Sequence, residues 1–121
     1  MGGRGTFAIN KKTNYNYKTI GQIEDVKILE GINGKHNLPE EAHSSKAYIK
    51  VDNYGNFVRY REFNSDKTSH FDIDYHPEYK ISKNYKPIYH IHFYNNGVRD
   101  PVGRKLTKNE FIKYRKYFKG R

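Results

Sequence analysis

The chain contains two stretches in which polar and apolar residues alternate, Asp72-Ile73-Asp74-Tyr75-His76 and His90-Ile91-His92. Successive side chains of a β-strand point to opposite faces of the sheet, so this alternation predicts two strands that place carboxylates and imidazoles on one face. The apolar residues between them would face the core. If the two strands are neighbours, one surface gathers groups that exchange protons near neutral pH.

The sequence around these stretches predicts an antiparallel sheet of about four to five strands. The expected strands cover residues 23–29, 46–52, 57–63, 70–76 and 88–94. The turn sequence Asn53-Tyr54-Gly55-Asn56 separates two of them and is typical of a β-hairpin. Residues 31–45 contain two Gly, a Pro and several polar residues, which favours a loop.

The pattern changes period near the C-terminus. Thr107 is followed three residues later by Glu110, the spacing of a capping box, which predicts a helix start. Phe111, Tyr114 and Phe118 would lie on one face of that helix. We therefore expect an α+β fold in which a C-terminal helix packs on one face of the sheet and leaves the other face polar.

Length and composition limit the domain organisation. A chain of 121 residues predicts one compact α+β domain over residues 23–121, preceded by a flexible basic arm or irregular cover over residues 1–22. Twelve Tyr and seven Phe argue against disorder. The absence of Cys excludes disulfides, thiolate zinc sites and a cysteine nucleophile. No apolar run approaches the length of a membrane span, so we expect a soluble protein with no membrane partner.

The polar face of the predicted sheet supplies the candidate catalytic residues. They are His76, His90, His92, Asp72, Asp74, Arg59 and Arg61. Any antiparallel sheet can show water a polar face, but Lys, Thr and Glu are usual there, whereas His, Asp and Arg transfer protons and stabilise phosphate. The arginine pair is the weaker part of the set, because strict alternation also puts Phe57 and Phe63 on this side.

Two chemistries suit these residues. In a metal-independent cleavage, one His takes the proton from a ribose 2′-hydroxyl, a second protonates the leaving oxygen, and Arg stabilises the charge on phosphorus. In a metal-assisted cleavage, His90 and His92 hold a divalent ion with help from Asp72, Asp74 or His76. A His-x-His pair alone is a weak signal, so we expect no metal and no other cofactor.

The net charge of +10, from 23 Lys and Arg against 13 Asp and Glu, predicts an acidic partner. The expected partner is nucleic acid, with RNA favoured, or an acidic surface of a host protein. Eight of the basic residues follow Gly103. The candidate nucleic-acid contacts are Arg4, Arg104, Lys105, Lys113, Lys116 and Lys119.

Several motifs resemble small phage and prophage domains of low-GC bacteria, among them the toxin-like domains fused behind phage minor head proteins. Besides the two opening stretches, these motifs are Gly2-Gly3-Arg4-Gly5, Leu38-Pro39-Glu40-Glu41, His43-Ser44-Ser45 and Leu106-Thr107. The resemblance implies a phage or mobile-element origin, a location in the cytoplasm of a bacterial host, and a set of working positions. Those positions are His43, Asp72, Asp74, His76, His90, His92 and Arg104.

Two functions remain open at this point. The first is a phage nuclease-like domain that cleaves RNA by His-based acid and base chemistry. The alternative is a non-catalytic anti-defence inhibitor, whose basic surface binds nucleic acid or a host nucleic-acid-processing complex. A chain that begins at its own Met1 suits this alternative as well as it suits a toxin.

Overall fold

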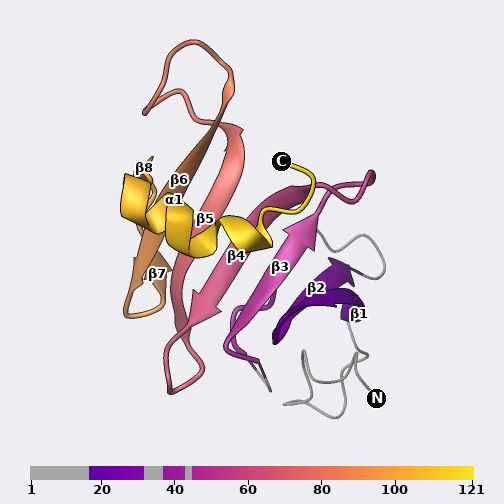
Figure 1. Ribbon diagram of the computed structural model, residues 1–121. Helices are drawn as coiled ribbons and strands as arrows, with labels where there is room; N and C mark the ends of the chain where they lie inside the picture. Colours follow the sequence, from indigo (N-terminus) through magenta and orange to yellow (C-terminus); the bar gives the residue numbers. More distant parts are fainter. Residues whose placement is uncertain (1–16, 32–36, 43–44) are drawn as a thin grey trace.

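The structure is a computed structural model that describes residues 17–31, 37–42 and 45–121. In these residues one sheet of eight strands carries a single short helix on one face (Figure 1). The strands are β1 (Tyr17–Ile23), β2 (Val26–Gly31), β3 (Ala47–Val51), β4 (Phe57–Phe63), β5 (Ser69–Pro77), β6 (Pro87–Asn95), β7 (Val98–Arg99) and β8 (Arg104–Lys105).

The strands follow one another across the sheet from β1 to β7, and β8 pairs with β6 beside β7. All neighbouring pairs are antiparallel except β2 and β3, which run parallel with Ile28 opposite Ile49. The prediction of an antiparallel sheet of four to five strands is therefore wrong, because the sheet is mixed and larger. The coarser assignment to an α+β arrangement stands.

The strands that were not predicted show little periodicity in the sequence. β7 and β8 have two residues each, too few to show alternation. β1 has no fully buried residue, and its sequence of Tyr, Lys, Thr and Gly was assigned to the N-terminal arm. The arm was predicted to reach residue 22, whereas the strand begins at Tyr17; residues 1–16, including Arg4, lie outside the described residues.

The hairpin of β3 and β4 confirms the prediction made from its turn. The Asp52 carboxylate accepts hydrogen bonds of 2.9 Å from the backbone N–H groups of Tyr54 and Asn56, and Gly55 takes a positive φ of 82°. Within β4 the register shifts, so that Val51 faces Phe57 and Lys50 faces Arg59. This bulge, with Val58 as its extra residue, turns Phe57 to the helix side of the sheet.

Helix α1 (Lys108–Tyr114) confirms the predicted capping box. The Thr107 side chain accepts from the Glu110 N–H at 3.1 Å, and the Glu110 carboxylate accepts from the Thr107 N–H at 2.8 Å. The helix ends at Tyr114 and continues as a 3-10 turn, Arg115–Tyr117. Figure 1 shows this segment lying across one face of the sheet.

The core between helix and sheet is largely aromatic. Phe118 packs on Phe57 with ring centroids 4.6 Å apart, and Tyr117 stacks on Tyr60 at 4.9 Å. Ile73 and Ile91, the apolar residues of the two opening stretches, are buried in the same cluster. Because these residues face the helix, the polar residues between them must face the opposite side of the sheet.

Candidate functional site

Strand register brings the polar residues of β4, β5 and β6 into two rows across the sheet. Arg61 lies opposite Asp72, which lies opposite His92. The parallel row beside it runs from Arg59 through Asp74 to His90. We call these six residues, together with His76 and Arg99, the polar cluster. Its aspartates and His90 have no solvent-exposed surface.

The two aspartates are held by three arginines. Arg59 donates to both oxygens of Asp74, at 2.6 and 3.0 Å. Arg61 does the same with Asp72, at 2.7 and 3.0 Å. Arg99 lies between the carboxylates and donates to Asp72 at 3.2 Å and to Asp74 at 2.7 Å. Paired guanidinium and carboxylate groups of this kind are the strongest hydrogen bonds in proteins and fix the orientation of both partners.

Sequence reasoning missed Arg99. It belongs to β7, which pairs with the end of β6 through Tyr94. Asn96 and Gly97 form the turn between β6 and β7, and a two-residue strand after a turn carries no pattern of its own. A basic residue shortly after such a turn was the only available signal.

The Arg61 guanidinium has no N–H group left to bind a substrate. Its Nη1 donates to the carbonyls of Leu38 and Pro39 at 2.9 and 3.1 Å, and its Nη2 also reaches the Tyr94 hydroxyl at 2.9 Å. With the two bonds to Asp72, all five N–H groups are used. Burial and the neighbouring Asp72 carboxylate raise the pKa of Tyr94 to about 12, so its hydroxyl stays protonated and donates to that carboxylate.

His90 and His92 are held in the same tautomer. The Nδ1 atom of His90 lies 2.7 Å from the Ile88 carbonyl, and that of His92 lies 2.9 Å from the Asp100 carbonyl. Because a carbonyl can only accept, Nδ1 carries a proton in both rings, and the lone pair of the neutral ring is on Nε2. Burial lowers the pKa of His90, so this ring is neutral at pH 7.

The pKa of His76 is shifted in the opposite direction. Its hydrogen bond with Asp74, of 3.4 Å from Nε2, raises its pKa, and its Nδ1 lies 2.8 Å from the Pro77 carbonyl. Both partners accept, which favours the imidazolium. The ring meets that of His90 edge-on at a centroid distance of 4.7 Å, and 41% of its side chain is exposed.

The Asp74 carboxylate stays ionised in this setting. Burial alone would raise its pKa, but the hydrogen bonds from His76 and Arg59 outweigh burial and hold that pKa well below its usual range. Two groups of side chains in the described residues place potential metal-binding atoms within 4.8 Å of one another. They are Asp74 with His76 and His90, and Glu78 with His90 and His92.

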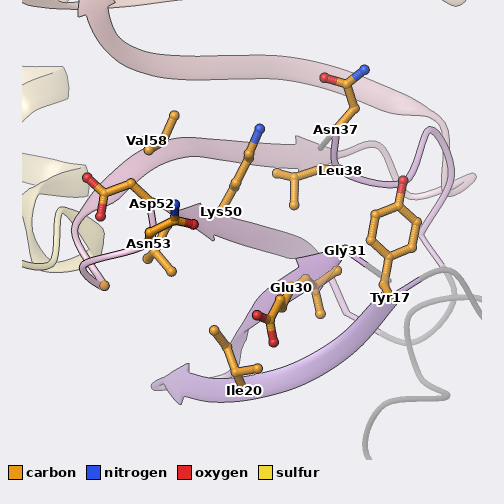
Figure 2. Close-up of a pocket in the computed structure, with 13 residues that line it drawn as sticks. Tyr17, Ile20, Glu30, Gly31, Asn37, Leu38, Lys50, Asp52, Asn53 and Val58 are labelled. Carbon is orange, nitrogen blue, oxygen red and sulfur yellow. The ribbon is translucent and has the colours of Figure 1, made fainter. Parts of the chain in front are cut away.

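Two pockets open on the cluster side of the sheet. One, of about 890 Å³, is lined by Arg59, Arg61, Tyr94 and Arg99. The other, of about 620 Å³, lies over β1 to β3, and Figure 2 shows Lys50 standing there between Val58 and Leu38. Both pockets include the same three lining residues, Tyr17, Asn37 and Leu38, so they adjoin each other. We call the two pockets together the groove.

The predicted nucleic-acid contacts are not among the residues that line the two pockets, although Lys105 lies opposite His90 in the sheet. Arg104 donates two 2.8 Å bonds to Glu110 and covers the Phe93 ring. Lys116 pairs with Glu24 at 3.2 Å. The other described contacts, Lys105, Lys113 and Lys119, are exposed. Because α1 covers the opposite face from the polar cluster, a ligand on this basic helix would not touch the cluster.

Two histidines fall outside the cluster for different reasons. A register shift at the start of β5 places Glu62 opposite Phe71 and Phe63 opposite Ser69, with His70 between the paired residues. The His70 ring packs against the rings of Phe71 and Phe93, away from the cluster. His43, which the family resemblance implied, lies outside the described residues.

Within the described part of the chain, no helix is long and apolar enough to cross a membrane. Comparisons of the whole chain with family models, with curated proteins and with solved structures each returned no match. The functional assignment therefore depends on the geometry of the polar cluster and its surroundings.

Proposed function

We propose that this chain is a small nuclease-like domain that cleaves RNA at the polar cluster. The observation that supports the proposal is the contact between His76 and His90, whose pKa values are shifted in opposite directions. A pair of titratable groups driven apart in this way is typical of a general acid and a general base that work together at neutral pH.

The roles follow from exposure and protonation. His76 is partly exposed, and its raised pKa favours the protonated ring; in that form it donates a proton to the leaving 5′-oxygen as the ribose 2′-oxygen attacks phosphorus and the P–O5′ bond breaks. Arg99, about one third exposed, binds the phosphate. His90 is buried, so it accepts the 2′-hydroxyl proton through a water molecule at Nε2. The products are a 2′,3′-cyclic phosphate and a free 5′-hydroxyl.

Charge and the shape of the cluster side support a nucleic-acid substrate. The groove presents Arg59, Lys50 and Arg99 on its floor and wall, and the chain carries a net charge of +10. Such a surface attracts a phosphate backbone. The resemblance to phage-encoded domains supports RNA of a bacterial host as the substrate.

The test is incubation of untagged protein with end-labelled RNA and with DNA of the same sequence. Cleavage of RNA to products with 2′,3′-cyclic ends is expected, and a single 2′-deoxy substitution should block cleavage at that position. His76→Ala should abolish cleavage, whereas His70→Ala, which changes a ring outside the cluster, should retain it. Full activity in His76→Ala, or no cleavage of any RNA by the parent, rejects the proposal.

One observation favours a second candidate, a non-catalytic binding protein such as a phage-encoded anti-defence inhibitor. Arg61 has no free donor, and His90 and His92 are almost fully buried, as in a cluster that only holds the sheet together. The exposed lysines would then bind nucleic acid or an acidic host protein. Tight binding of RNA without any cleavage in the same assay identifies this function.

A further inference from the structure

We propose that Glu78, His90 and His92 bind one divalent transition-metal ion of the Zn²⁺ type. Their ligand atoms lie within 4.8 Å of one another. Donors bonded at about 2.1 Å in a tetrahedral site are about 3.4 Å apart, so pairs of ligand atoms up to 4.8 Å apart need to close by at most about 1.4 Å. Glu78 can move that far, because it is only partly buried at the start of the β5–β6 connection.

The two imidazoles are already prepared as ligands. A metal-binding histidine presents one nitrogen lone pair and donates its other N–H to a carbonyl or carboxylate, which fixes the ring. His90 and His92 do this through the Ile88 and Asp100 carbonyls, which leaves Nε2 as the ligand atom in both. Alternate positions on one strand face place the two rings 5.1 Å apart.

The Nε2 atom of His90 provides independent support. It is buried and has no hydrogen-bond partner among the described residues. A buried polar atom without a partner is destabilising, and native proteins rarely keep one without a reason. An ion bonded to this lone pair removes the cost.

Space beside His92 is kept open by a glycine. A Cβ atom at Gly103 would lie 3.0 Å from His92 Nε2 and 2.8 Å from the Ile91 carbonyl oxygen. Any other residue would therefore press on the ligand nitrogen. The absence of a side chain at position 103 avoids this contact with the ligand nitrogen.

The overlapping group of Asp74, His76 and His90 is a poorer site. The Asp74 oxygens already accept hydrogen bonds from Arg59 and Arg99, and these two positive charges would repel a cation. The Nδ1 atom of His76 already lies 2.8 Å from the Pro77 carbonyl, and its Nε2 lies 3.4 Å from Asp74. The Glu78 carboxylate, by contrast, accepts one long hydrogen bond from the described residues, 3.4 Å from the Lys80 N–H.

This inference replaces our expectation of a metal-free protein, which was based on the weakness of a His-x-His pair alone. It also changes the third ligand from the residues considered in the sequence, Asp72, Asp74 or His76, to Glu78. Three protein ligands leave a fourth position for water, as in catalytic zinc sites. The proposal does not depend on RNA cleavage, and the two roles of His90 are alternatives. An ion bonded to Nε2 occupies the lone pair that the proposed general base uses, so the metal-bound chain would not cleave RNA by that route.

The experiment measures binding without RNA. Untagged protein is freed of metal with a chelator, dialysed, and titrated with ZnCl₂ by calorimetry, and its thermal unfolding is followed with and without Zn²⁺. One ion per chain and a higher melting temperature are expected. Glu78→Gln should weaken binding by at least about tenfold, the loss seen even for outer partners of metal ligands. The control, His76→Gln, should bind as the parent does.

Co²⁺ serves as a second probe, because its visible spectrum changes when imidazole nitrogens replace water. The parent and His76→Gln should show the change, and His92→Gln should not, provided that circular dichroism confirms its fold. Absence of saturable Zn²⁺ binding overturns the proposal. The proposal is also overturned if the parent and Glu78→Gln bind Zn²⁺ with equal affinity, or if His76→Gln loses as much Zn²⁺ affinity as Glu78→Gln. Because no RNA is present, failure of cleavage leaves this result unaffected.

Discussion

Replacing Asp72 by Asn tests how strongly the polar cluster contributes to stability. The Asp72 carboxylate accepts two hydrogen bonds from Arg61, at 2.7 and 3.0 Å. It also accepts one from Tyr94 at 2.9 Å and one from Arg99 at 3.2 Å. The substitution keeps the shape of the side chain, removes its charge, and turns one acceptor into an NH₂ group that faces donors.

The expected loss is large because Arg61 is only 5% exposed and would be left without its counter-charge. Breaking a buried ion pair by removing one partner costs about 3–5 kcal/mol. A domain of this size has a free energy of unfolding of about 6–18 kcal/mol, so the variant loses a substantial part of it. At about 4 °C per kcal/mol, the melting temperature should fall by about 12–20 °C.

Urea unfolding followed by circular dichroism, with linear extrapolation to water, measures this difference. The matched control is Asp25→Asn, an exposed carboxylate whose pair with Lys46 spans 3.9 Å, and its stability should change by less than about 0.5 kcal/mol. If Asp72→Asn lowers the free energy of unfolding by less than about 1 kcal/mol, the arginine charges are solvated or paired with other groups, which refutes the reasoning.

Three further predictions concern other parts of the molecule. Hydrogen bonds from Arg104 hold the pKa of Glu110 at about 2, so Glu110→Gln should be less stable than the parent at pH 7. Since this carboxylate stabilises only while ionised, the difference should shrink as pH falls from about 4.5 to 2 in thermal unfolding; a constant difference contradicts it. Gly120→Ala should lower stability by more than about 1 kcal/mol in urea, because φ is +79° there and the new Cβ meets the Asn56 side chain. An unchanged midpoint contradicts this. Reversing the charge of three lysines of the C-terminal segment should weaken RNA binding equally for all RNA sequences and flatten the salt dependence of binding in fluorescence titrations. Unchanged binding at every salt concentration would show that the segment is only a solvated surface. The residues reversed together are Lys113, Lys116 and Lys119.

Local patterns in the sequence determined several elements of the fold. The alternation at residues 72–76 and 90–92 predicted β5 and β6 and which residues share a face, since period two depends only on the strand conformation. The capping box of Thr107 and Glu110 predicted the helix start, because its hydrogen bonds join residues three apart. These features need no knowledge of the rest of the chain.

The tertiary structure decided everything that depends on which distant segments pair. The parallel pairing of β2 with β3 and the two-residue strands β7 and β8 have no local signature. One extra residue in β4, Val58, put Arg59 on the opposite face from Phe57, although strict alternation placed both on one side.

The composition of the site was decided in the same way. Arg99 joins the aspartates only because β7 folds back on β6, and Glu78 approaches His90 only because β5 and β6 pair in register. Burial lowers the pKa of His90 and the Asp74 carboxylate raises that of His76, and both effects exist only in the packed sheet. A sequence specifies which groups are present on a strand, but their distances and protonation states arise from contacts between residues far apart in the chain.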